Sequence, residues 1–135
     1  MGELLINHDR LADFLSALLE KLSGPQSRAA FWFYHPVELP IPAESLSGAS
    51  PFLNSGSSLA GDGYLVHLTR SNAATVAAFF AEDLDALSAL THLEVESAGQ
   101  LQFRSYDNFG VNLPGPALDA AWLKSLALLG IVTID

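Results

Sequence analysis

A strand, a helix and a second strand follow one another between Gly63 and Ser97, and this stretch constrains the fold more than any other part of the chain. Residues 64–69 have the composition of a strand, and Ser71 or Asn72 can cap the helix that follows. The apolar residues of that helix recur at helical spacing: Val76, Phe79, Phe80, Leu84, Leu87 and Leu90. Residues 93–96 then form the second strand. A crossover helix of this length usually returns the chain parallel to the first strand, so this unit predicts a sheet with one buried face.

A helix and an aromatic strand are predicted before this unit. Asn7 is a suitable N-cap for a helix over residues 8–23, in which leucines at positions 11, 15, 18 and 22 form one apolar stripe. Residues 29–35 form the strand, and Phe31, Trp32, Phe33 and Tyr34 place aromatic rings on both of its faces. Such a strand is either buried on both sides at the centre of a sheet or part of a surface that binds a partner.

A long loop rich in proline, serine and glycine is predicted over residues 36–62. Loops of this length are uncommon in compact domains, and they serve as binding loops, lids or plain connections. Residues 37–41 could form an edge strand or a polyproline segment, and Phe52 and Leu53 could anchor the loop on the core. The loop is therefore expected either to form part of a binding site or to be a plain mobile connection.

The C-terminal part of the chain predicts a three-strand meander over residues 93–96, 101–106 and 109–113. A three-residue turn at 97–99 would pair Val95 with Leu101 and would leave Glu94 and Glu96 on a solvated face. The second hairpin would pair Phe103 with Leu113. A last helix is expected to begin near Pro116 and to bury Leu118, Trp122, Leu126 and Leu129, and residues 131–134 form a closing strand.

These elements predict a single α+β domain over residues 1–135, a two-layer sandwich with three helices on a mixed, mostly antiparallel sheet of about five or six strands. The element order resembles that of the small acidic type III secretion chaperones. The similarity lies in topology across much of the chain and in no motif, and the closing strand and the serine-rich loop depart from it.

Composition and charge exclude several classes of function. The 135 residues contain 15 acidic and only 6 basic side chains, a net charge of −9, which opposes binding to nucleic acid or to anionic lipid. The absence of cysteine removes disulfides and thiolate chemistry. No apolar run is long enough to span a bilayer, and the acidic N-terminus does not have the pattern of a secretory signal, so a cytoplasmic protein without a membrane partner is expected.

The histidines do not have the spacing of a metal site. His8, His35, His67 and His92 include no pair at the separation that places two imidazoles on one helix face, so neither a metal nor a cofactor is predicted. His67 and His92 would approach one another only if their strands were adjacent. The serines at positions 57 and 58 lack the strand and helix of a nucleophile elbow, so no catalytic residue is assigned.

Recognition residues are expected on the aromatic strand, near the histidines and at the turn around Asp107. The turn combines a carboxylate, an amide and aromatic rings, although Asp and Asn also simply favour turns. Arg104 is one of the few basic residues. Its expected partner is Glu94, Glu96 or the carboxylate of a ligand. The predicted binding residues are Trp32, Tyr34, His35, His67, Arg104, Tyr106, Asp107 and Asn108.

Two functions from different classes fit these observations. The first is a non-catalytic acidic protein-binding domain of the inhibitor, immunity or chaperone-type adaptor kind, with a protein partner that could be basic and with a homodimer as a further option. The second is a small enzyme or ligand-binding domain with a site between the 36–62 loop and the sheet, using His35, His67 or Asp107.

Overall fold

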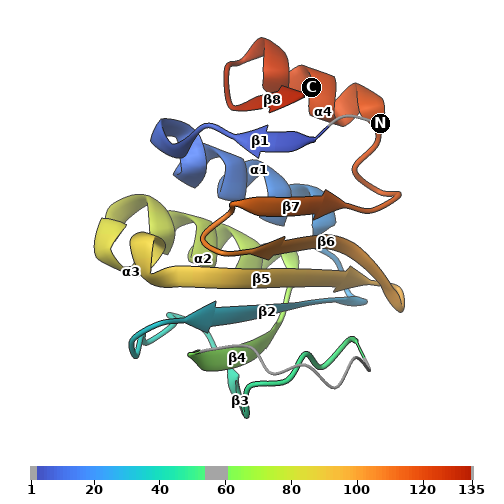
Figure 1. Cartoon of the computed structure of the whole chain (residues 1–135). Coiled ribbons are helices and arrows are strands. Elements are labelled where there is room, and N and C mark those ends of the chain that lie inside the picture. Colours follow the sequence, from blue (N-terminus) through green and yellow to red (C-terminus); the bar gives the residue numbers. More distant parts are fainter. Residues whose placement is uncertain (1–2, 54–60, 135) are drawn as a thin grey trace.

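The chain folds into the predicted α+β sandwich, in which helices cover one face of a six-stranded antiparallel sheet (Figure 1). The computed structural model describes residues 3–53 and 61–134. Within these residues the strand order is β3-β4-β2-β5-β6-β7, and β1 and β8 form a separate two-stranded sheet. The elements are β1 (Leu4–Ile6), η1 (His8–Arg10), α1 (Leu11–Leu22), β2 (Ser27–Phe33), β3 (Glu44–Leu46), β4 (Asp62–His67), α2 (Arg70–Glu82), α3 (Leu84–Ala89), β5 (Leu90–Ser97), β6 (Gln100–Tyr106), β7 (Val111–Pro114), α4 (Ala120–Leu128) and β8 (Val132–Ile134).

The strand–helix–strand unit is present as β4, α2 and β5, but its two strands are not neighbours. Both strands pair antiparallel with β2, which lies between them, so β4 and β5 run parallel to one another without sharing a ladder. Every ladder among the described residues is antiparallel, and the mixed pairing that the crossover helix predicted is absent there. The aromatic strand is therefore the central strand.

The helix of this unit begins and ends at other residues than predicted. Thr69, not Ser71 or Asn72, is the N-cap of α2, and its hydroxyl accepts a hydrogen bond from the Asn72 amide at 3.1 Å. The apolar pattern suggested one helix through Leu90. Asp83 interrupts it, because its carboxylate accepts a hydrogen bond from the Ala86 amide and so caps the short helix α3.

The meander pairs in a different register from the predicted one. The hairpin between β5 and β6 turns through two residues, Ala98 and Gly99, both with positive φ, which is the geometry of the tightest hairpins. Val95 consequently faces Phe103 instead of Leu101, with a bulge after Val95. In the next ladder Phe103 faces Pro114, one residue beyond the predicted Leu113.

The chain termini differ from the predictions in two respects. Leu4–Ile6 forms a strand, β1, which pairs with the predicted closing strand β8. Asp119 caps α4, so this helix starts after Pro116, and Leu129 at its end is 62% exposed instead of buried.

The core lies between the sheet and the helices and is dominated by aromatic rings. The rings of Phe31 and Phe80 have centroids 5.9 Å apart, and those of Phe14 and Phe103 are 5.5 Å apart. These rings join α1 and α2 to β2 and β6. Because their burial supplies much of the hydrophobic stabilisation, the helix-covered face has a structural role.

Part of the predicted loop lies on the sheet. Its described residues include the edge strand β3 at Glu44–Leu46, later in the chain than the edge strand considered at 37–41, while Val37, Leu39 and Ile41 pack against the core. Residues 54–60 of the loop, with the serines at 57 and 58, lie outside the described residues. None of the described helices has the length and apolar character needed to cross a membrane.

Candidate functional site

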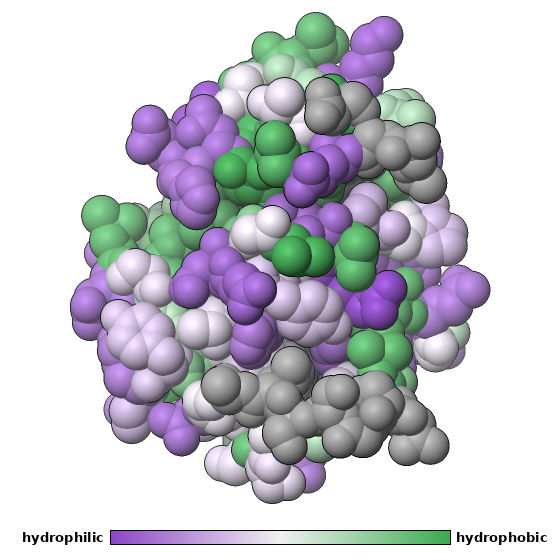
Figure 2. All heavy atoms as spheres, in the orientation of Figure 1, coloured by the Kyte–Doolittle hydropathy of each residue, from purple (hydrophilic) through white to green (hydrophobic). Residues whose placement is uncertain are grey.

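The candidate site is the sheet face that α1 and α2 leave uncovered, which is turned toward the viewer in Figures 1 and 2. Strand pairing arranges its side chains in rows that run from β2 through β5 to β6. These rows are Trp32, His92 and Tyr106; Ala30, Glu94 and Arg104; and Arg28 and Glu96. Three of the predicted binding residues, Trp32, Arg104 and Tyr106, therefore lie on one face of the sheet.

Glu94 is the centre of this face and is fully buried. The Ser50 hydroxyl donates a hydrogen bond to its Oε1 at 2.5 Å, and the Tyr106 hydroxyl donates to its Oε2 at 2.6 Å. The expectation that Glu94 is solvated beside Glu96 is wrong, because the loop residue Ser50 covers it. A buried carboxylate requires such donors, since its hydration has been lost.

The environment of Glu94 perturbs the titration of its neighbour Tyr106. Burial raises the pKa of the Tyr106 hydroxyl above its ordinary value of 10.0, and the hydrogen bond to Glu94 and the charge of Glu94 raise it further. The tyrosine therefore stays protonated and keeps donating to the carboxylate at neutral pH. Its hydroxyl serves as a fixed donor within the protein.

His92 lies beside Tyr106, with ring centroids 5.6 Å apart. Burial lowers the pKa of His92 below its ordinary value of 6.5, and the nearby Asp107 and Glu94 only partly oppose this shift. The imidazole is thus mostly neutral at pH 7, and its Nδ1 accepts a long hydrogen bond of 3.4 Å from the Asp107 amide.

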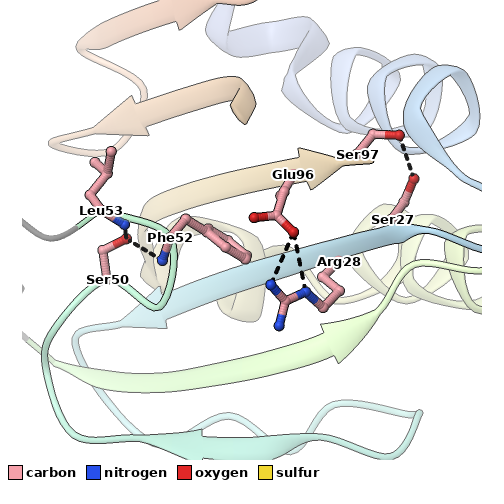
Figure 3. Close-up of polar contacts among 7 residues, drawn as sticks. All are labelled: Ser27, Arg28, Ser50, Phe52, Leu53, Glu96 and Ser97. Carbon is pink, nitrogen blue, oxygen red and sulfur yellow. Dashed lines mark hydrogen bonds and ion pairs between the residues drawn. The ribbon is translucent and has the colours of Figure 1, made fainter. Parts of the chain in front are cut away.

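The loop is attached to this face by a second set of contacts, drawn in Figure 3. Ser50 Oγ accepts hydrogen bonds from the amides of Phe52 and Leu53, at 3.1 and 3.0 Å, which folds the chain into a tight turn. The Arg28 guanidinium lies 5.3 Å from the centroid of the Phe52 ring and pairs with Glu96 at 3.0 Å. The loop is therefore held against β2 and β5 by polar and cation–π contacts.

The turn between β6 and β7 has an unusual backbone. Asp107, Asn108 and Phe109 all have positive φ, of 56°, 52° and 66°. The Asn108 side-chain amide donates to the carbonyls of Ser88 and Leu90, at 3.2 and 2.9 Å, and so joins the turn to the α3–β5 connection. The side chain of Asn108 is therefore used within the fold, whereas Asp107 is exposed.

Trp32 is completely buried rather than available at the surface. Its ring lies against β4 at Gly63, where an added Cβ would come within 2.6 Å of the indole nitrogen. Among the described residues, Trp32 Nε1 has no hydrogen-bond partner. Trp32 is therefore not accessible to a partner in this structure.

Tyr34 and His35 lie at the end of β2, apart from the row of Trp32. Tyr34 is 62% exposed, and its ring packs edge-on against the His35 ring, with centroids 4.8 Å apart. His35 Nε2 lies 3.8 Å from the Asp85 carboxylate of α3. These two residues therefore form part of a separate surface shared with α3.

His67 is brought near none of the other predicted residues. It faces Arg28 across the ladder, whereas His92 faces Trp32 at the other end of β2. The pair of His67 and His92 considered from the sequence is thus separated by the intervening strand. Among residues 3–53 and 61–134, no group of three His, Asp or Glu side chains could hold a metal ion.

Two hollows are present elsewhere on the described surface. A groove of about 490 Å³ lies between the loop and β4, lined by Pro36, Val37, Leu39, Ile41 and Tyr64 among others. A groove of about 960 Å³ lies between α1 and α2, lined by small side chains of α2 and by Trp122. None of the eight predicted binding residues lines either groove.

Sequence reasoning missed Glu94 and Ser50 as the centre of the loop-covered face. The alternation of β5 does place Glu94 on the face opposite Leu93 and Val95, but it carries no signal that another segment covers that face. A signal of this kind is the apolar pair Phe52–Leu53 in the serine-rich part of the loop. Chemically, both oxygens of Glu94 are occupied by donors from the protein, so the described arrangement is suited to holding the loop.

Comparison of the chain with family models, curated proteins and solved structures gave no match. The resemblance to the type III secretion chaperones accordingly stays an expectation based on element order. The functional conclusions below follow from the geometry and charge of the chain itself.

Proposed function

We propose that the chain is a non-catalytic, acidic protein-binding domain of the inhibitor, immunity or chaperone-type adaptor kind. The observation that supports this most is the exposure of large apolar side chains on a protein with a net charge of −9. Leu128 is 80% exposed, Leu84 67%, and Tyr34 and Leu129 62% each. Exposed apolar groups rimmed by charges are typical of surfaces that bind other proteins, and the charge favours a basic partner.

The loop-covered face gives further support. Its polar groups bind one another, since Ser50 and Tyr106 donate to Glu94 and Arg28 pairs with Glu96. They therefore hold the loop in one arrangement, as a preorganised binding surface requires.

Light scattering on the purified chain, alone and after mixing with lysate from its own source, tests this proposal. We expect a discrete heavier species after mixing, whose second component mass spectrometry identifies. High salt should weaken the complex, because complementary charge is screened. A chain that stays alone in lysate, and that a small molecule stabilises strongly against heat, would contradict the proposal.

A small-ligand domain is the second candidate, and the groove between the loop and β4 favours it. Its lining by Val37, Leu39, Ile41 and Tyr64 suits an apolar ligand, and its volume of about 490 Å³ lies in the range of small-molecule sites. The residues first suggested for this function, His35, His67 and Asp107, do not line the groove. A thermal-shift screen compared between the wild type and a Val37→Asp variant would detect such a ligand.

A further inference from the structure

The exposed surface at the junction of β2 and α3 combines apolar and acidic groups with one histidine, and no lysine or arginine belongs to it. It consists of Tyr34, His35 and Asp85, which contact one another, and of Leu84, which precedes Asp85 in α3; it is called the Tyr34–Leu84 surface below. Tyr34 donates its amide to the Ala89 carbonyl at 3.1 Å, which places the end of β2 beside the end of α3. His35 then bridges the two elements, because it contacts the Tyr34 ring and lies 3.8 Å from Asp85.

The two large side chains of this surface remain exposed in the folded chain. Tyr34 is 62% and Leu84 67% exposed. Leu84 is the first residue of α3, between the acidic residues Asp83 and Asp85, and it packs into no described core. Burying such groups against a partner would be favourable by about 25 cal/mol per Å² of apolar area.

The charges around these side chains have one sign. Glu82, Asp83 and Asp85 lie within four consecutive residues, and Asp83 also caps α3. Two further exposed acids border the same end of the sheet: Asp62, which faces Phe33 across the ladder, and Asp107, whose turn is bonded to the α3–β5 connection through Asn108. Neither Lys nor Arg occurs in residues 82–92, which contain α3 and the start of β5, or in residues 105–114 around the Asp107 turn.

We infer that the Tyr34–Leu84 surface docks a basic segment of a partner protein that also carries an apolar side chain. An arginine or lysine of that segment stacks on the exposed Tyr34 ring and pairs with Asp85, whose side chain is 86% exposed. The apolar side chain covers Leu84. A second copy of this chain fits less well, because it brings the same net charge of −9. The inference rests on the proposed function and names the surface and the partner chemistry.

A synthetic peptide in which lysine and arginine alternate with leucine is the probe, followed by the shifts of backbone amide signals in NMR. Two matched peptides serve as controls: one with glutamate in place of the basic residues, and one with serine in place of leucine. We expect the basic, leucine-containing peptide to shift the signals of Tyr34, His35, Leu84 and Asp85 most, and to bind at least about tenfold more tightly than either control. Raising the salt concentration should weaken it.

The variant that tests the surface is Tyr34→Ser with Leu84→Ser. Both side chains are exposed, so the double variant should fold, which a thermal unfolding curve checks. We expect it to lose at least about tenfold in peptide affinity. A control, Leu5→Ser with Ile134→Ser, removes two exposed side chains of the small β1–β8 sheet and should bind the peptide as the wild type does.

Three results would overturn the inference: equal binding by the wild type and the double variant, shifts spread evenly over all acidic surfaces, or a wild-type dimer that the double variant fails to form. A failure of the proposed function gives a different result: the chain then forms no complex in lysate, even if it binds the basic peptide. If the lysate complex forms equally with the double variant, the proposed function stands and only this surface is rejected.

Discussion

Glu94 is the residue on which the loop-covered face depends, because two hydroxyl groups from different elements donate to its buried carboxylate. Hydrogen bonds to a charged group contribute more than neutral ones, and a buried carboxylate that loses a donor retains the cost of its desolvation. Tyr106→Phe removes one of these donors with little change in volume. We expect it to lower the free energy of unfolding by about 1–3 kcal/mol, measured by urea denaturation.

Tyr34→Phe is the matched control for this change. The Tyr34 side chain is exposed and makes no hydrogen bond with the described residues, so removing its hydroxyl should change the unfolding free energy by less than about 0.5 kcal/mol. Equal losses in the two variants would mean that the contact between Tyr106 and Glu94 does not stabilise the fold.

His92 gives the second residue-scale prediction, which concerns pH. Because burial lowers its pKa below the unfolded value of 6.5, the unfolded chain binds more protons at this site than the folded chain does. The contribution of His92 to the free energy of unfolding should therefore be fully present above about pH 6.5 and should decrease as the pH drops through that value. Replacing His92 with Gln should reduce the loss of unfolding free energy between about pH 7.5 and about pH 5.5. Denaturation curves at the two pH values measure the difference, and an unchanged loss would contradict the assignment.

At the scale of elements, the attachment of the loop depends on Ser50. This serine donates to Glu94 and accepts from the amides of Phe52 and Leu53, so it fixes both the loop and its turn. Ser50→Ala should speed amide hydrogen exchange at Phe52 and Leu53 by about tenfold or more, since a hydrogen-bond loss of about 1.4 kcal/mol corresponds to that factor. Ser47→Ala, an exposed serine of the same loop, should leave both amides unchanged. Comparable acceleration in the two variants would place the attachment elsewhere.

The elements themselves were largely predictable, because most of them follow from hydrophobic periodicity. The strand–helix–strand unit and the helix before the aromatic strand are recovered within a few residues. The misplaced boundaries have local causes: Thr69 and Asp83 each accept an amide hydrogen bond and so decide where α2 and α3 begin. The hairpin register was not predictable in the same way, because the Ala98–Gly99 turn is one residue shorter than expected and a bulge follows Val95.

At the scale of the whole molecule, the pairing of strands that are distant in the sequence determines which residues lie together. The sequence did not reveal this strand order. Because β2 lies between β4 and β5, it separates His67 from His92. Trp32, in this central strand, is fully buried. The turn around Asp107, by contrast, was recognisable from its residues, and it does lie beside His92. A candidate site confined to one turn could thus be located, whereas one built from several strands required the strand order.

The last prediction concerns the polar contacts that join β1 and β8 to the main sheet. Asn112 of β7 is buried; its side-chain oxygen accepts from Ser105, and its amide nitrogen donates to the carbonyls of Leu4 and Phe109, at 3.2 and 2.8 Å. It therefore connects β1, and through β1 also β8, to the main sheet. Asn112→Ala leaves these three groups without their partner in a water-poor site, so we expect a loss of about 2–4 kcal/mol in the free energy of unfolding. Leu113→Ala, at the neighbouring exposed position of the same strand, should lose less than about 1 kcal/mol in the same urea titration. If Asn112→Ala lost no more than Leu113→Ala, the small sheet of β1 and β8 would be held by apolar packing of Leu4 and Ile6 instead of by this polar connection.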